Sequence, residues 1–97
     1  MFARCVTMQG RPETMDQAQK IFAESVIPAA RQQPGFENAW FLMDPVTGKG
    51  MSVTMWATEA DMQAGERNGF LQAQIAKFGP LLVGPPTREL YVVAAQS

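Results

Sequence analysis

Residues 36–56 read FENAWFLM (36–43), DPVTGKG (44–50) and MSVTMW (51–56), and this order predicts a β-hairpin. The two outer segments carry aromatic and β-branched residues that are enriched in strands, while the Asp, Pro and Gly residues between them tolerate turn dihedrals. We therefore expect two antiparallel strands joined by this turn. Residues 39–43 are continuously apolar, so the pattern lacks the polar face of a half-solvated sheet. This indicates a sheet that is covered on both faces, by helices on one and by a second copy of the chain on the other.

The segments around the hairpin complete one small α+β domain. Strand formers predict two more strands over 2–8 and 89–95, and apolar residues at helical spacing predict helices over 14–32, 58–64 and 68–78. Thr14 and Gln17 have the spacing of a capping box, Pro28 should kink the first helix or weaken its last turn, and Gly65 should separate the later two. The order βαββαβ is the ferredoxin-like arrangement, in a single domain over residues 1–97.

Composition excludes several classes of protein. Hydrophobic residues make up 46% of the 97 residues and charged residues only 18%, a low share that favours association with another copy. The formal net charge is −1 without a basic stripe, so we expect no nucleic-acid partner. No apolar run approaches the roughly 20 residues that span a bilayer, and the N-terminus reads as a strand rather than a signal peptide. We therefore expect a cytoplasmic protein that does not interact with membranes.

The chain has no histidine and only one cysteine, Cys5. This excludes Ser-His-Asp and Cys-His catalytic units, a haem held by a proximal histidine, and zinc sites built from histidine or several thiolates. It also excludes an internal disulfide framework. Any chemistry must proceed without imidazole, and we predict no metal site.

Three spaced segments carry a family resemblance: Pro34-Gly35-Phe36 before the second strand, residues 44–49 in the hairpin, and residues 51–60 from the third strand into the next helix. Together they resemble the antibiotic biosynthesis monooxygenase family of dimeric α+β barrels. The resemblance implies a homodimer whose two sheets face each other, with a pocket in each subunit between the sheet and its helices. Some members are cofactor-free oxygenases of electron-rich aromatic or quinol-like substrates, others degrade haem, and many have no known activity.

The resemblance also singles out residues of the third strand. In the oxygenase branches a tryptophan ends this strand and lines the pocket, and Trp56 matches that position. One branch has an asparagine four residues earlier, where this chain has Ser52, which is a departure. The haem-degrading branch needs an asparagine in the first strand and a histidine in the later helix. Neither residue exists here, so the resemblance does not extend to haem degradation.

Trp56 and Ser52 are the candidate catalytic residues. Trp56 is either a pocket wall that stacks on a flat substrate or a core anchor at a strand end. Ser52 and Thr54 share its strand face, where their hydroxyls either orient a bound carbonyl or phenol or simply fit the pleated strand.

Arg4 lies among apolar residues of the first strand. It either holds an anionic or enolate-like substrate oxygen or forms an ion pair with Glu37 or Glu89. The remaining candidate substrate-binding residues, with Thr54 and Arg4, are aromatic: Trp40, Phe22, Phe70 and Phe78.

Two functional hypotheses follow. The first is a cofactor-independent monooxygenase that oxidises a small aromatic or polyketide-like substrate in a dry apolar pocket. The second is a module that binds, carries or isomerises a small apolar or aromatic ligand. The second hypothesis needs no general base, and the sequence shows none on the pocket face.

Overall fold

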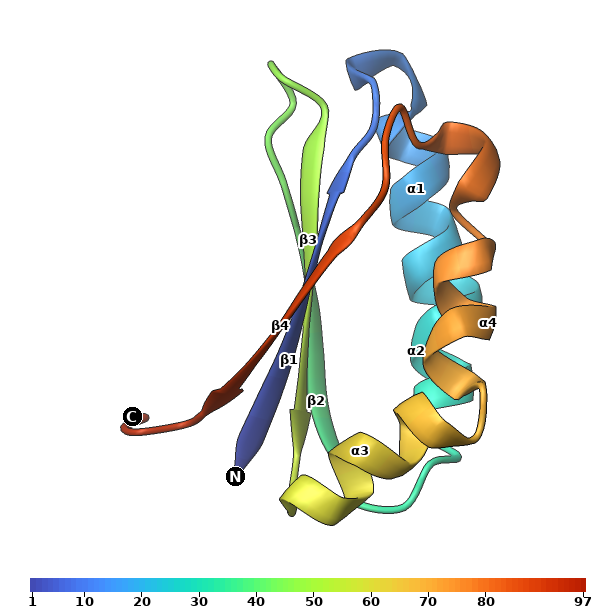
Figure 1. Ribbon diagram of the computed structural model, residues 1–97. Helices are drawn as coiled ribbons and strands as arrows, with labels where there is room; N and C mark the ends of the chain where they lie inside the picture. The colour runs from blue at the N-terminus through green and yellow to red at the C-terminus, as the bar shows by residue number, and fades with distance from the viewer.

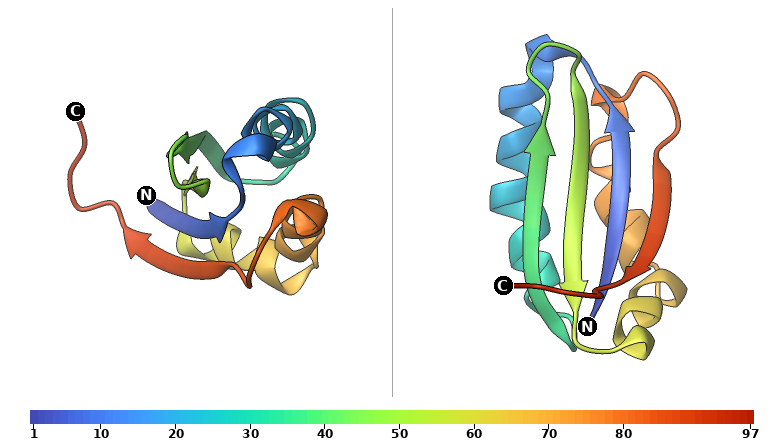
Figure 2. Two further views of the ribbon diagram at one scale, coloured as in Figure 1. Left: turned by 90° about the horizontal axis from the view of Figure 1, so that it is seen from above. Right: turned by 90° about the vertical axis from the view of Figure 1, so that its left-hand side faces the viewer.

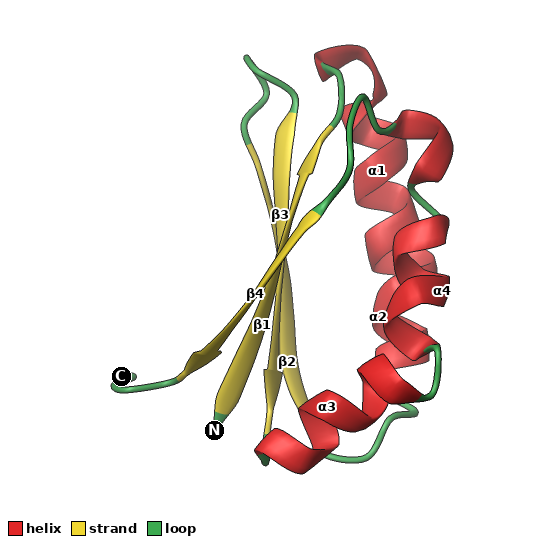
Figure 3. Ribbon diagram, in the orientation of Figure 1, coloured by secondary structure: helices red, strands yellow, loops and turns green.

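The computed structural model describes residues 1–97 and has the predicted order of elements. A four-stranded antiparallel sheet forms one layer, and all the helices lie in a second layer on one of its faces (Figures 1 and 3). The strands are β1 (Phe2–Gln9), β2 (Phe36–Met43), β3 (Lys49–Trp56) and β4 (Thr87–Val92). The main helices are α1 (Met15–Ile21), α2 (Ile27–Ala30), α3 (Glu59–Arg67) and α4 (Phe70–Ala76). A π-helical turn spans Phe22–Val26, and 3₁₀ turns span Pro12–Thr14 and Gly79–Leu81. The α+β, ferredoxin-like prediction is confirmed.

The strands are arranged in the order β2-β3-β1-β4, so the first strand of the chain lies inside the sheet (Figure 2). It pairs with β3 on one side and with β4 on the other. β2 has the predicted bounds, whereas β3 begins two residues earlier than predicted and β4 occupies 87–92 instead of 89–95.

The predicted hairpin turn is built around Asp44 and Gly48. The Asp44 carboxylate accepts hydrogen bonds from the backbone N–H groups of Val46 and Thr47 at 2.9 and 3.4 Å. Gly48 has φ +80°, and a Cβ there would lie 2.6 Å from the Gly10 carbonyl oxygen. Only glycine fits this conformation and this close approach.

Residues 15–30 form one continuous helical run with a π turn in its middle (Figure 1). The irregularity predicted at Pro28 is this π turn. Proline has no N–H to donate to the Glu24 carbonyl, and the helix widens just before Pro28. The predicted capping box was wrong. The Thr14 hydroxyl donates to the Arg11 carbonyl at 3.2 Å and makes no cap hydrogen bond, because a 3₁₀ turn already leads into α1.

The break predicted at Gly65 was also wrong, because α3 continues to Arg67. Gly65 is buried, and a Cβ there would lie 3.4 Å from the Phe70 ring and 3.5 Å from Nη2 of Arg4. These are ordinary van der Waals distances, so Gly65 is a packed residue inside α3 and does not end the helix. Thr58 does cap α3, since its hydroxyl accepts from the Asp61 N–H at 3.1 Å.

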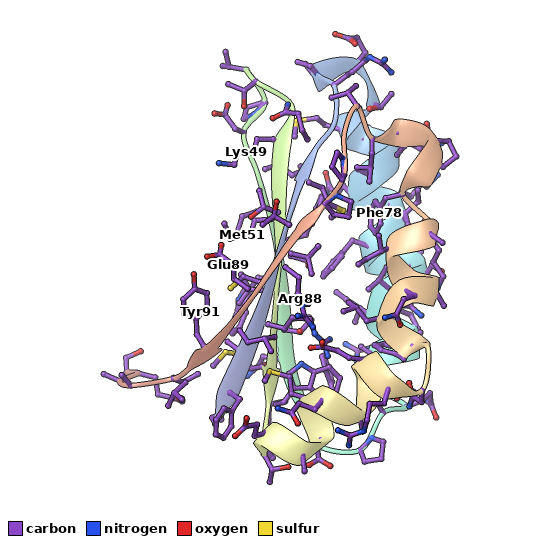
Figure 4. All side chains as sticks on the ribbon, viewed as in Figure 1. Lys49, Met51, Phe78, Arg88, Glu89 and Tyr91 are labelled. Carbon is purple, nitrogen blue, oxygen red and sulfur yellow. The ribbon has the colours of Figure 1, made fainter.

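The sheet face that points away from the helices carries large apolar side chains. Trp40, Leu42 and Tyr91 are 47, 53 and 50% exposed, respectively. Figure 4 shows Met51 and Tyr91 on this side, opposite the helices, together with Lys49 and Glu89. We call this surface the open face; the second copy expected to cover it stays a prediction. None of the helices combines the length and the apolar character needed to cross a bilayer.

Candidate functional site

A cavity of ≈ 30 Å³, partly open to solvent, lies between the sheet and the helices, and we call it the Arg4 cavity. Nine of its 13 lining residues are hydrophobic. The polar ones are Arg4, Ser52, Thr54 and Gln74. The volume is enough for about two water molecules. A mostly apolar lining with a few converging polar groups is typical of small-molecule sites.

Strand pairing brings the polar residues of this cavity together. Arg4 of β1 lies opposite Thr54 of β3, and Val6 lies opposite Ser52. Because side chains alternate along a strand, all three polar residues point to the helix-covered face. The prediction that Ser52 and Thr54 share the face of Trp56 is confirmed by this register.

Arg4 is the only charged side chain in the buried core, at 2% exposure. Its Nη2 donates to the Met62 carbonyl at 2.6 Å, and its Nε donates to the Glu66 carboxylate at 3.3 Å. The predicted ion-pair partners Glu37 and Glu89 were wrong, because α3 brings Glu66 to this position. These bonds use two of the five N–H groups of the guanidinium.

The charge state of Arg4 follows from its surroundings. Burial, and to a smaller extent the positive charge of Arg88, lowers the pKa of Arg4 to about 10. The side chain therefore remains a cation near neutral pH. Arg88 also pairs with Glu66, so one carboxylate joins two guanidinium groups. This Arg4–Glu66–Arg88 cluster has a formal charge of +1.

Trp56 is 0% exposed and does not line the Arg4 cavity. Its Nε1 donates to the Thr54 hydroxyl at 2.9 Å, and its ring lies 5.4 Å below the Arg4 guanidinium carbon. Phe36 and Phe70 pack edge-on against it. The environment is that of a core anchor, and Trp56 is connected to the cavity through its contacts with Thr54 and Arg4.

The three predicted phenylalanines all line the Arg4 cavity: Phe22, Phe70 and Phe78. Phe22 and Phe78 each stack on Phe41, with ring centroids 5.1 and 5.9 Å from it. Figure 4 shows Phe78 in the space between the sheet and the helices. The structure thus adds Phe41 to the aromatic set.

Trp40 is not part of this site. It pairs with Val53 on the open face, whereas Phe36 packs against Trp56 on the covered face. Phe36 pairs with Trp56 and Asn38 pairs with Met55, so a β-bulge adds one extra residue to β2 between these two pairs. This extra residue reverses the alternation, so that Trp40 and Phe36 point to opposite faces.

Sequence reasoning missed Glu66 and Gln74. Glu66 is 62 positions from Arg4, so no local pattern connects them. Gln74 precedes Phe78 by four residues, and the helical spacing of the apolar side of α4 could have indicated it.

The site can bind and polarise an oxygen-bearing ligand. Arg4 offers N–H donors that Met62 and Glu66 leave unused, and the Ser52 hydroxyl lines the same cavity. No Asp or Glu lines the cavity, and the Glu66 carboxylate is engaged by two arginines. No group of three or more Cys, Asp and Glu side chains is placed to hold a metal ion.

Comparison with known proteins shows the fold. No family model matches the sequence, and no curated protein does. Among solved structures, a protein of unknown function from Nitrosomonas europaea is similar at 24% identity and TM-score 0.77, over 99% of this chain and 92% of that one. A monooxygenase from the ActVA-Orf6 gene of Streptomyces coelicolor, in complex with the ligand nanaomycin D, is similar at 21% identity and TM-score 0.75, over 99% and 89%. An antibiotic biosynthesis monooxygenase is similar at 14% identity and TM-score 0.74, over 98% and 100%.

At these identities the likeness is one of fold: the chain folds as structures named antibiotic biosynthesis monooxygenases do.

Proposed function

We propose that the chain is a cofactor-independent monooxygenase that oxidises a small aromatic substrate of the quinol or anthrone type in the Arg4 cavity. The observation that carries the proposal is a buried guanidinium with unused donors, set beside the Ser52 hydroxyl in a mostly apolar cavity. A structural neighbour named as a monooxygenase binds nanaomycin D, which supports a ligand of this kind.

The reaction needs only O₂ as co-reactant. An anthrone in its phenol form loses a proton to solvent and becomes a phenolate whose charge is shared with a ring carbon. This carbanion gives one electron to O₂, and the two radicals combine to form a C–O bond. Protonation gives a hydroperoxide, which loses water as the C–H and O–O bonds break and a C=O bond forms. The balance is R₂CH₂ + O₂ → R₂C=O + H₂O.

In this scheme the protein favours ionisation of the substrate instead of supplying a base. A fixed cation in a dry site stabilises a developing oxyanion more strongly than water does. Arg4 therefore lowers the pKa of the bound phenol, and Ser52 orients its oxygen. The apolar walls exclude water from the reactive carbanion.

Oxygen uptake with a panel of hydroquinones and anthrones tests the proposal. We expect substrate-dependent uptake that Ser52→Ala reduces about 2- to 10-fold, the value of one hydrogen bond. Ser25→Ala is the matched control, because Ser25 is half-buried on the helical run but does not line the cavity. Absence of substrate-dependent uptake across the panel contradicts the oxygenase proposal.

One observation favours a second candidate, a non-catalytic module that binds the same class of ligand. The cavity holds no free carboxylate and no other general base. Ligand-dependent thermal stabilisation without oxygen uptake would support this candidate over the first.

We also propose that the functional unit is a homodimer formed by two open faces. The apolar side chains exposed there, among them Trp40 and Leu42, support this arrangement. Sedimentation velocity at micromolar concentration should give a dimer that Trp40→Glu dissociates. Gln19→Glu, on the exposed side of α1, should leave the dimer intact. A wild-type monomer at this concentration contradicts the proposal.

A further inference from the structure

The guanidinium in the Arg4 cavity has donors left for a ligand with two oxygens. Its bonds to Glu66 and Met62 use the Nε–H and one N–H of Nη2, respectively. Three of its five N–H groups therefore remain, one on Nη2 and two on Nη1. Because these two nitrogens are neighbours in one plane, they can bind the two oxygens of a single carboxylate side by side.

The uncharged polar side chains of the same cavity can all donate hydrogen bonds: Ser52, Thr54 and Gln74. The Thr54 hydroxyl accepts from Nε1 of Trp56 at 2.9 Å, so its own proton is available to a ligand. The Gln74 amide oxygen accepts from Nζ of Lys77 at 2.7 Å, which leaves its NH₂ group for a ligand. No Asp or Glu lines the cavity, so an anion there meets donors without a competing carboxylate.

The charge around the cavity is positive. The Arg4–Glu66–Arg88 cluster has a formal charge of +1, and Figure 4 shows Arg88 on the helix side of β4. Lys77 adds a further positive charge beside Gln74. One negative charge in the cavity would balance that of the cluster, and the mostly apolar lining strengthens the attraction because its dielectric constant is low.

The size of the cavity restricts the ligand to a few atoms. Its volume of ≈ 30 Å³ holds about two water molecules. The two oxygens of a carboxylate match two such positions, so a small carboxylate fits without movement of the walls. The cavity is partly open to solvent, so a small ion can enter it.

We propose that the Arg4 cavity is a binding site for a small monocarboxylate, of the size of formate or acetate. The two carboxylate oxygens accept from the remaining N–H groups of Arg4, and the hydroxyls of Ser52 and Thr54 donate to them from β3. The inference goes beyond the proposed oxygenase, because binding of the anion requires neither O₂ nor an aromatic ring.

Thermal unfolding of the full chain at pH 7 and constant ionic strength tests the inference. Sodium acetate replaces sodium chloride in steps up to about 100 mM, and a ligand that binds only the folded state raises the unfolding temperature. We expect a saturable rise with acetate. Acetamide has the same shape without the charge and should leave the unfolding temperature unchanged.

Variants of the donors identify the site by isothermal titration with acetate. Arg4→Met should abolish binding, and Arg4→Lys should weaken it about tenfold or more, because an ammonium group has no planar fork. Ser52→Ala should weaken acetate about 2- to 10-fold, the value of one hydrogen bond. Ser25→Ala is the matched control and should bind acetate like wild type, because Ser25 does not line the cavity.

Several results would overturn the inference. An equal rise of the unfolding temperature in wild type and Arg4→Met indicates a general salt effect, and an equal rise with acetamide shows that the charge is irrelevant. If Arg4→Met does not fold, unchanged acetate affinity in both Arg4→Lys and Ser52→Ala has the same meaning. Acetate binding without oxygen uptake from any phenol contradicts only the oxygenase proposal, and oxygen uptake without acetate binding contradicts only this inference.

Discussion

Replacing Arg4 with methionine should remove most of the affinity for ionised phenols while keeping the fold. Methionine preserves much of the aliphatic volume of the side chain but none of its five N–H donors. Two of these donors serve Met62 and Glu66, so a bound phenolate can engage those that remain. A hydrogen bond to a charged group contributes about 1.5–3 kcal/mol. At about 1.4 kcal/mol per tenfold, Arg4→Met should weaken phenolate binding roughly 10- to 150-fold.

The effect on stability should be smaller than the number of lost contacts suggests. The substitution leaves the Met62 carbonyl without its partner, at a cost of about 1–3 kcal/mol, and removes a cation–π contact worth about 0.5–2 kcal/mol. It also removes the desolvation of a buried cation, which opposes folding. Urea denaturation should therefore show a folded variant of reduced stability.

Isothermal titration with a phenol and with its methyl ether gives the readout. The neutral ether should change less than about threefold in Arg4→Met, because it carries no negative charge for the guanidinium to attract. Arg88→Met is the matched control: it removes the other arginine of the cluster, which is 48% exposed and outside the cavity. It should change phenolate affinity less than about threefold, as expected for a solvent-exposed ion pair. A folded Arg4→Met protein that binds phenolate like wild type refutes the assignment.

The pH dependence gives an independent check. Burial lowers the pKa of Arg4 to about 10, so the guanidinium loses its charge as the pH rises through that value. A ligand with a permanent negative charge, such as a naphthalenesulfonate, should bind with constant affinity from pH 7 to 9 and more weakly above pH 10. Arg4→Met should show no such decrease.

Three further predictions concern the core, the open face and the turns. Trp56→Phe should cost about 1–3 kcal/mol in urea denaturation, because it loses a hydrogen bond and leaves a small cavity; an unchanged midpoint contradicts the core assignment. Burial and the charge of Glu89 raise the pKa of the Cys5 thiol, so iodoacetamide should modify Cys5 slowly at pH 8. The modification should be faster in Glu89→Gln, and equal rates in the two proteins argue against this electrostatic effect. Gly35→Ala should lower the thermal unfolding temperature of the protein more than Gly69→Ala does. Both glycines have positive φ, but only at Gly35 would a Cβ overlap a neighbouring side chain. Equal losses of stability would mean that backbone strain alone determines the effect.

The hairpin and the order of elements were predictable because their signals are local. Strand β2 appears with its predicted bounds, and the turn follows from the dihedral preferences of its Asp and Gly residues. The register between β1 and β3 depends on residues far apart in the sequence. The alternation of side chains along β3 was nevertheless enough to place Ser52 and Thr54 on the same face of the sheet.

What the sequence did not reveal depends on contacts between distant segments. A one-residue bulge places Trp40 on the open face, and nothing in the composition of residues 36–38 marks it. Glu66 meets Arg4 because α3 packs against β1, with Gly65 beside the guanidinium. The sequence predicted a helix break at Gly65, because a glycine is visible in the sequence but the neighbours packed against it are not.

The strand order has a consequence for how the protein is made. β1, which precedes the other three strands in the chain, lies inside the sheet and pairs along one edge with β4, the last of the four. Ribosomes add about 5–20 residues per second, so β1 keeps an unpaired edge for several seconds in the nascent chain. Arg88 is also part of that late strand, so the charge cluster at Arg4 is completed only at that stage. The polar groups around Arg4 thus reach their final arrangement only after β4 has joined the sheet.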